Sequence, residues 1–377
     1  MQIGSNGKVE SFLSVFFIFL LIFSVYALAE TPIILSLADN KILEKPIRAE
    51  LILKIGSDKE NEDFYKIPKI AIGGSGQIYI LDTGNSRILC FSREGNFLFS
   101  FGRRGQGPGE LSDDACNIKI LSDGNIYVID NRQRRINVYN QEGKFLYSAK
   151  TSGWYNDIVL LNNVYYLTST ILKEGHKPVH ISRKLAKIDD DFGIFVEPAV
   201  GILKQISQLP MPEPWRYSFH NFNFARLVAT KNNELIFSQG FPYRLIKYDA
   251  MGNLLKDIMG EVDFDTYLHV KFIVDKFTTS YITDPPRPVL VLLNVSVLKD
   301  TQLAAPFLNP EKGTLYIDIY DLDLNLLSRY RITSIIADMR KEEYVLQTLI
   351  DNDYNLYAVI YKKNDYPMVV KYKLNFD

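Results

Sequence analysis

Two histidines have a spacing that could bind a metal ion. His176 and His180 are four residues apart, and on a helix both imidazoles would lie on one face. Pro178 lies between them and the surrounding residues are typical of a strand, so a helix is not expected. The H-E-x-x-H pattern of zinc enzymes is also absent. We interpret both as exposed loop histidines and predict no metal site.

Two acidic triplets resemble the beginning of a calcium-binding loop. Their members, at alternate positions, are Asp321, Asp323 and Asn325 in the first and Asp351, Asp353 and Asn355 in the second. The glycine and the closing bidentate glutamate of such a loop are missing. The pattern therefore favours tight turns.

Signatures of known catalytic sites are absent as well. The sequence has no G-x-S-x-G elbow, no P-loop and no catalytic Cys–His pattern. Its 2 cysteines are too few for a four-thiolate zinc site or a disulfide scaffold. We assign no catalytic residue, no metal and no cofactor.

Composition points to a large folded β protein. Of 377 residues, 47% are hydrophobic, which excludes global disorder. The net charge is −1, whereas a nucleic-acid-binding protein would carry a basic excess. Aromatic residues make up 13% of the chain, and this favours β-sheet.

The N-terminus has the layout of a secretory signal peptide. Residues 12–29 are an uninterrupted apolar run that ends in A-L-A and precedes Glu30. We expect residues 1–29 to be removed, which gives a secreted or periplasmic protein. The alternative is a retained N-terminal anchor, because the run is just long enough to span a bilayer. No later stretch is long enough, and the apolar residues 288–298 predict a buried strand.

An internal repeat organises the rest of the chain. Residues 70–100 and 118–148 align without a gap, and the matched pairs include Gly76 with Gly124, Tyr79 with Tyr127, Asp82 with Asp130 and Arg87 with Arg135. Each unit divides into four short strands separated by glycine-containing turns. The inner strands are apolar at nearly every position, so both of their faces must be covered, as between blades packed around an axis.

Four weaker copies continue to the C-terminus, and the sixth stops after its third strand. The apolar-alternating segment 48–56 precedes the first complete unit and is predicted to supply the missing outer strand. The expected fold is all-β: a six-bladed β-propeller of four-stranded antiparallel blades, with the ring closed by an N-terminal strand. We expect a lead-in over 30–46 and the propeller over 47–377, with the repeats clearest at 64–111 and 112–150.

The segment FGRRGQGPGEL at 101–111, with the unit after it, resembles the NHL repeat of six-bladed, TolB-like β-propellers. Many exported bacterial proteins have this layout, and the resemblance implies the fold. It also implies a structural role, hydrogen bonding of the loop after the second strand, for Asp82, Arg87, Asp130 and Arg135. Such propellers include hydrolases and lyases that hold a divalent ion in the central tunnel. A metal-dependent enzyme of this kind is therefore the alternative function.

The cysteines leave two interpretations open. Cys90 and Cys116 fall at the same alternating strand positions as isoleucines that we expect to be buried. They are either free buried thiols or, in an oxidising compartment, a disulfide between adjacent blades.

One face of the propeller is the candidate binding face. The inter-blade connections and the middle loops concentrate arginine, tryptophan and tyrosine, namely Arg103, Arg104, Arg132, Arg134, Trp154, Tyr155, Trp215, Arg216, Tyr243 and Arg244. Tryptophan and arginine are over-represented at binding hot spots. The alternative is that these residues plug the tunnel mouth or cap a blade. We interpret the protein as a non-catalytic binding or scaffold module for a protein, peptide or glycan partner.

Overall fold

The computed structural model describes residues 33–35, 44–56, 64–151, 153–169, 179–185, 192–196, 226–239, 243–260, 291–309, 314–336, 343–362 and 365–376. Every regular element in these ranges is a β-strand. Residues 34–377 form one compact unit. The predicted signal peptide lies outside the described residues, and so does its cleavage point.

The first three blades are consecutive four-stranded antiparallel sheets. Blade 1 contains β3 (Lys69–Ile72), β4 (Ile78–Asp82), β5 (Arg87–Phe91) and β6 (Phe97–Phe101). Blade 2 contains β7 (Ala115–Ile120), β8 (Ile126–Asp130), β9 (Arg135–Tyr139) and β10 (Phe145–Lys150). Blade 3 contains β11 (Tyr155–Leu161), β12 (Val164–Ser169), β13 (Val179–Leu185) and β14 (Phe192–Val196).

The other three blades follow the same plan with local changes. Blade 4 contains β15 (Arg226–Ala229), β16 (Glu234–Gln239), β17 (Arg244–Asp249) and β18 (Leu254–Gly260), and the short β1 (Ile33–Leu35) is the neighbour of β18 in the same sheet. Blade 5 has its inner strand in two pieces, β19 (Val291–Leu292) and β20 (Ser296–Leu298), followed by β21 (Gln302–Asn309), β22 (Thr314–Asp321) and β23 (Leu326–Ile336). Blade 6 contains β24 (Glu343–Ile350), β25 (Asn355–Lys362), β26 (Met368–Asn375) and the N-terminal β2 (Glu44–Ile55).

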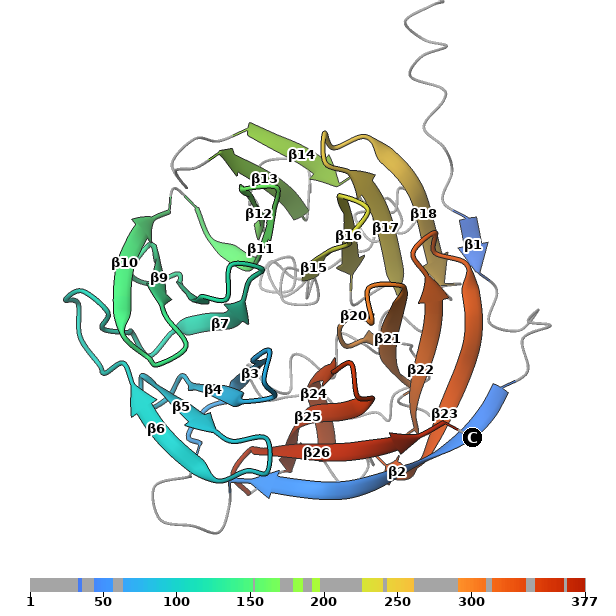
Figure 1. Cartoon of the computed structure of the whole chain (residues 1–377), viewed down its shortest axis with the longest axis horizontal. Coiled ribbons are helices and arrows are strands. Elements are labelled where there is room, and N and C mark those ends of the chain that lie inside the picture. Colours follow the sequence, from blue (N-terminus) through green and yellow to red (C-terminus); the bar gives the residue numbers. More distant parts are fainter. Residues whose placement is uncertain are drawn as a thin grey trace, which may run out of the picture. The chain divides into compact units, whose positions relative to one another are not determined.

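The ring is closed by the N-terminal strand, as the sequence predicts. β2 pairs antiparallel with β26, from Arg48 opposite Asn375 to Ile55 opposite Val369. Its first residues also pair in parallel with β23, from Glu44 opposite Arg329. One strand therefore completes blade 6 and joins it to the outer edge of blade 5 (Figure 1).

Blade 5 differs from the sequence prediction in two respects. The segment 288–298 does not form one buried strand, because the pairing with β21 stops between Leu292 and Ser296. Pro306 lies opposite this break and has no N–H to donate to a ladder. Residues 302–309, for which no strand is predicted from the sequence, form β21.

The core consists of apolar clusters between neighbouring blades. Blades 1 and 2 share a cluster that includes Ile88 and Val128, and blades 6 and 1 share one that includes Val359 and Ile80. All residues of β4 and of β8 are buried, because a blade packs on each face. The outer strand β6 is largely exposed. Burial of both faces of the middle strands holds the inner strands around a common centre.

Candidate functional site

The connection between blades 1 and 2 is a tightly bonded loop. Glu110 accepts hydrogen bonds from the Gly107 N–H at 2.8 Å and from Arg103 Nε at 2.8 Å. A Cβ atom on Gly105 would lie 1.9 Å from the Glu110 carboxylate, so a side chain there would displace the carboxylate from these hydrogen bonds. The glycines and the glutamate of G-x-G-P-G-E therefore all stabilise the same loop conformation.

The four repeat positions hold loops in place, but they do so differently in the two blades. In blade 1, Arg87 Nε donates to Asp82 at 2.9 Å. In blade 2, Asp130 instead accepts from the N–H and the hydroxyl of Ser112 at 2.7 and 2.6 Å. Arg135 donates to the carbonyls of residues 106, 107 and 110. The blade 2 pair therefore fixes the inter-blade loop from two sides.

Three cations surround a single carboxylate at the end of this connection. Arg132 Nη1 forms an ion pair with Asp113, and Arg104 Nη2 lies 3.7 Å from the same carboxylate. Lys66 Nζ lies 3.9 Å from it and donates to the Asp113 carbonyl at 2.6 Å. We call Lys66, Arg104, Asp113 and Arg132 the Asp113 cluster. One negative charge cannot neutralise three positive ones, so the cluster carries a positive excess.

The Asp113 cluster borders a surface hollow of about 550 Å³. The hollow is lined by Arg104, Gly105, Gln106, Leu111, Ser112, Asp113, Arg132, Gln133 and Arg135. The side chains of Arg104 and Arg132 are 67% and 58% exposed, so they remain accessible to a partner. Sequence reasoning identified both arginines but missed Lys66 and Asp113, which become neighbours only in the fold.

An arginine and a tryptophan are stacked in blades 2 and 3. The Arg134 guanidinium lies 5.4 Å from the centre of the Trp154 ring. Trp154 is 53% exposed, which is unusual for so large an apolar side chain. Cation–π contact holds the ring in one orientation without covering it.

Several predicted binding residues are not on the surface. Tyr155 is 2% exposed and Tyr243 is 5% exposed, so both belong to the core. Arg244 is buried and pairs with Asp257, its Nε 2.9 Å from Oδ1. These three residues do not lie on an exposed face. Trp215 and Arg216 lie outside the described residues.

The inner strands carry a second polar feature that sequence reasoning missed. Each has a polar residue four positions before the turn to the next strand, and these residues are Lys69, Asn117, Asp157, Arg226, Asn294 and Gln347. We call them the tunnel ring. The signal in the sequence is a polar residue at one fixed place in an otherwise apolar strand.

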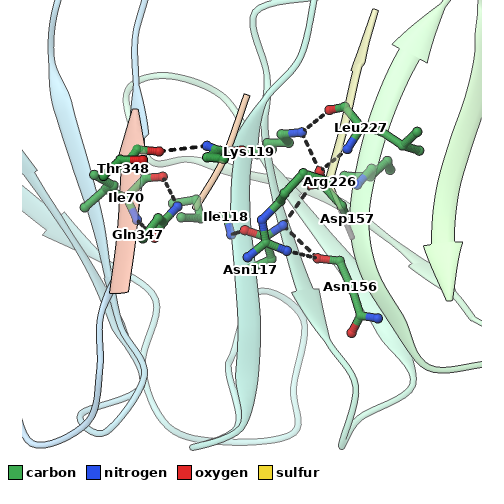
Figure 2. A network of polar contacts seen from close by, with 12 residues as sticks. Ile70, Asn117, Ile118, Lys119, Asn156, Asp157, Arg226, Leu227, Gln347 and Thr348 are labelled. Carbon is green, nitrogen blue, oxygen red and sulfur yellow. Dashed lines mark hydrogen bonds and ion pairs between the residues drawn. The ribbon is translucent and has the colours of Figure 1, made fainter. Parts of the chain in front are cut away.

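Hydrogen bonds from the tunnel ring connect blade 2 to blade 3, blade 3 to blade 4, blade 5 to blade 6 and blade 6 to blade 1. Asp157 is fully buried and accepts from Asn117 Nδ2 at 2.9 Å, Lys119 Nζ at 2.7 Å and the Leu227 N–H at 2.8 Å. Figure 2 shows this network together with Gln347, which bonds the backbone of Ile70. The inner strands of neighbouring blades share no sheet pairing, so these side chains connect them.

The histidines and the acidic triplets, which were considered as metal ligands, occupy strands and turns where the structure describes them. Among the described residues, no group of three or more His, Cys, Asp or Glu could hold a metal ion. Both acidic triplets are turns, because Asp321 and Asp351 each accept backbone N–H groups of their own loop. His180 was expected in a loop, which is wrong: it lies in β13, where alternating β-branched residues favour a strand. His176 lies outside the described residues.

Both cysteines are free thiols. Cys90 is buried in blade 1, and burial raises the pKa of Cys116 to about 12. A thiol with such a pKa is protonated at neutral pH and is a poor nucleophile.

Comparison with known proteins gives the same fold class. A family model described as a 6-bladed beta-propeller matches residues 59–194. A candidate exported protein of Bacteroides fragilis is 12% identical, with a TM-score of 0.52, and the match covers 92% of this chain and 99% of that one. A member of the DUF4221 family from Bacteroides vulgatus is 11% identical, with a TM-score of 0.55, and the match covers 89% and 100%.

At these identities the likeness is one of fold alone. No curated protein resembles the sequence significantly. No helix long and apolar enough to cross a membrane occurs among the described residues. The chain is a six-bladed β-propeller.

Proposed function

We propose that this chain is an exported, NHL-like β-propeller that acts as a non-catalytic binding or scaffold module. Its partner is an acidic protein or peptide or a charged glycan, which binds at the Asp113 cluster. The observation that carries the proposal is the placement of Lys66, Arg104 and Arg132 around one carboxylate beside an open hollow.

The chemistry of the cluster suits an acidic partner. Arginine offers a planar fork of donors that matches carboxylate and sulfate groups. Asp113 already draws Arg104 and Arg132 together, so an incoming anion meets side chains that are partly ordered. An anion also supplies the negative charge that the cluster lacks.

Trp154 and Arg134 supply a different kind of contact. The exposed indole gives rigid apolar area, and truncating such a residue in an interface costs about 1–3 kcal/mol of binding free energy. Arg134 holds the ring without burying it. A partner that bears both acidic and apolar or sugar-ring groups fits this combination.

Capture from the native compartment tests the proposed function. Wild type is compared with the double variant Arg104→Ala/Arg132→Ala and with a control variant, Arg331→Ala. Arg331 is an exposed arginine of β23 that pairs with Glu44 of β2. We expect the double variant to lose partners that wild type and Arg331→Ala retain, with melting temperatures nearly unchanged because surface ion pairs contribute little. Identical partner lists from all three proteins would refute binding at this face.

Export is tested separately. N-terminal sequencing of the secreted or periplasmic product is expected to begin at Glu30. A full-length product in the membrane fraction would support the retained anchor instead.

A further inference from the structure

Exposed aromatic side chains flank the Asp113 cluster on both sides. On one side, Tyr65 directly precedes Lys66 and is 71% exposed, more than any other large apolar side chain in the described part of the chain. On the other side, Trp154 is stacked with Arg134, which lies two residues after Arg132. Isolated exposed aromatics are ordinary, but aromatics that border a charged cluster are typical of a binding surface.

These side chains come from loops at the same face of the propeller. In a blade of four antiparallel strands, the loop between the second and third strands lies at the same end as the connections to the neighbouring blades. Such loops hold Tyr366 between β25 and β26, Tyr65 and Lys66 ahead of β3, Arg104 between β6 and β7, Arg132 and Arg134 between β8 and β9, and Trp154 ahead of β11. We call them the aromatic arc. They belong to blades 6, 1, 2 and 3, which follow one another around the ring (Figure 1).

Contacts on the blade 1 side join two tyrosines to the cluster. The rings of Tyr65 and Tyr366 pack edge to face with their centres 6.0 Å apart. A Cβ atom on Gly84 would lie 2.9 Å from the Tyr65 Cβ, so the backbone of Gly84 packs against Tyr65. The carbonyl of Gly84 in turn lies 3.5 Å from Arg104 Nη2. The tyrosine pair is therefore continuous with the arginines.

Hydrogen bonds on the blade 3 side do the same for Trp154. Gln133, between Arg132 and Arg134, donates through Nε2 to the Gly105 carbonyl at 2.5 Å. This bond holds the loop between β8 and β9 against the connection that carries Arg104. The Thr151 N–H donates to the Arg134 carbonyl at 2.9 Å, which ties the connection that carries Trp154 to the same loop. The order along the arc is therefore aromatic, cationic, aromatic.

The arc carries charges of both signs, and its cations are concentrated in the middle. Asp113 is shared by the three cations of the cluster. Glu110 pairs with Arg103 at 2.8 Å, and Asp365 accepts the N–H of Tyr366 at 2.8 Å at one end of the arc. A partner with uncharged ring faces on both sides of a carboxylate therefore fits the arc better than a chain that is charged at every residue.

We infer that the partner at this face is a linear acidic glycan in which uronic acid residues neighbour uncharged sugars. A carboxylate of the glycan binds Arg104 and Arg132, and sugar rings on either side pack against Tyr65 and Trp154. The inference rests on the proposed binding face and names the chemical class of its partner.

Sugar rings suit the exposed aromatics for a chemical reason. The C–H groups on one face of a pyranose ring carry a slight positive charge and pack on the negative face of an aromatic ring, while the hydroxyl groups at the rim stay hydrated. The arginine fork matches the carboxylate of a uronic acid. An acidic peptide has the carboxylates but no flat ring beside each of them, so it uses the cluster without using both ends of the arc.

Titration with three ligands tests the inference. A hyaluronan oligosaccharide has acidic and uncharged rings in alternation, an oligoglutamate peptide with the same number of carboxylates has no rings, and a chitin oligosaccharide has rings without acid. We expect wild type to bind hyaluronan most tightly. Tyr65→Ala/Trp154→Ala should bind hyaluronan at least about tenfold more weakly, whereas its affinity for oligoglutamate should change little. Arg104→Ala/Arg132→Ala should lose both acidic ligands.

Two further variants serve as controls. Tyr65→Phe/Trp154→Phe keeps an aromatic ring at both positions and should retain hyaluronan binding. Leu98→Ala removes an exposed apolar side chain of the outer strand β6 and should bind like wild type. Melting temperatures of all variants should stay close to that of wild type, because the replaced side chains are exposed.

The outcomes separate this inference from the proposed function. Tighter binding of oligoglutamate than of hyaluronan by wild type would make the partner a peptide and overturn the inference. Unchanged hyaluronan binding in Tyr65→Ala/Trp154→Ala, or equal weakening of both acidic ligands in it, would also overturn the inference and leave the Asp113 cluster in place. Unchanged binding of both acidic ligands in Arg104→Ala/Arg132→Ala would instead refute the proposed function.

Discussion

Arg104 and Arg132 lie on different loops and both approach the carboxylate of Asp113. Arg104 belongs to the connection between blades 1 and 2, and Arg132 to the loop between β8 and β9. The inter-blade loop, which hydrogen bonds of Glu110 and Arg135 hold in place, brings the two arginines together. The same loop therefore connects two blades of the fold and positions the arginines of the proposed binding face.

Replacing Asp113 by Asn should strengthen the capture of an acidic partner. The substitution removes the one internal counter-ion of Lys66, Arg104 and Arg132. The gain should shrink as salt is added, because exposed charges are screened. Binding at two ionic strengths measures this, with the exposed turn residue Asp300→Asn as the control. Equal or weaker binding in Asp113→Asn would contradict the role of the cluster.

Replacing Asp157 by Ala should destabilise the fold by about 3–5 kcal/mol, because it removes a fully buried carboxylate and leaves Lys119, the Asn117 amide and the Leu227 N–H without their acceptor. Asp323→Ala breaks a second Lys–Asp pair of the same 2.7 Å length, with Lys247. Asp323 is 76% exposed and Glu234 also pairs with Lys247, so its loss should cost about 0–1 kcal/mol. Urea unfolding of both variants compares the two costs. Similar costs would show that the tunnel ring does not tie the blades together.

Deleting residues 30–57 should destabilise the whole propeller and cause aggregation. The deletion removes β2 and exposes the edges of β26 and β23, and unpaired strand edges invite intermolecular pairing. Melting temperature and size-exclusion chromatography report the effect. A truncated protein with the parent melting temperature and solubility would show that the ring does not need this strand.

Acid should loosen the connection between blades 1 and 2. Hydrogen bonds from the Gly107 N–H and Arg103 hold the pKa of Glu110 below its usual value. A lowered folded-state pKa stabilises the fold above the unfolded value, near pH 4.5, and this contribution is lost as pH falls through the folded value. Wild type should therefore be more stable than Glu110→Gln at neutral pH, and the gap should close in acid.

Thermal melts across this pH range give the comparison, and the exposed turn residue Glu142→Gln serves as the control. A gap between wild type and Glu110→Gln that stayed constant with pH would mean that the charge of Glu110 does not hold the loop.

The fold could be predicted because each repeat carries local signals. Gly76 and Gly124 have positive φ at equivalent turns, and the strands after them are apolar throughout. The closing strand could also be predicted, since the last repeat lacks one strand and residues 48–56 can supply it. The interruption of the blade 5 inner strand could not be predicted from residues 288–298, because Pro306, which lies opposite the break, belongs to the neighbouring strand.

The candidate sites were harder to predict, because side-chain direction and ring closure decide them. Trp154 and Tyr155 are adjacent in sequence, yet one is exposed and the other buried. Lys69 and Arg226 belong to different blades and influence each other only after the ring has formed. Residue types typical of hot spots therefore predicted the exposed Arg104, Arg132 and Trp154. They also predicted core residues such as Tyr155, and they did not indicate the tunnel ring.

The affinity of an oligoglutamate peptide for wild type and for Arg104→Ala/Arg132→Ala tests the central claim most directly. The proposed function predicts salt-sensitive binding to wild type, weakened at least about tenfold in the double variant, and no binding of an oligoglutamine peptide. Equal affinity of wild type and the double variant for the acidic peptide, or equal binding of both peptides, would contradict recognition of an acidic partner at the Asp113 cluster.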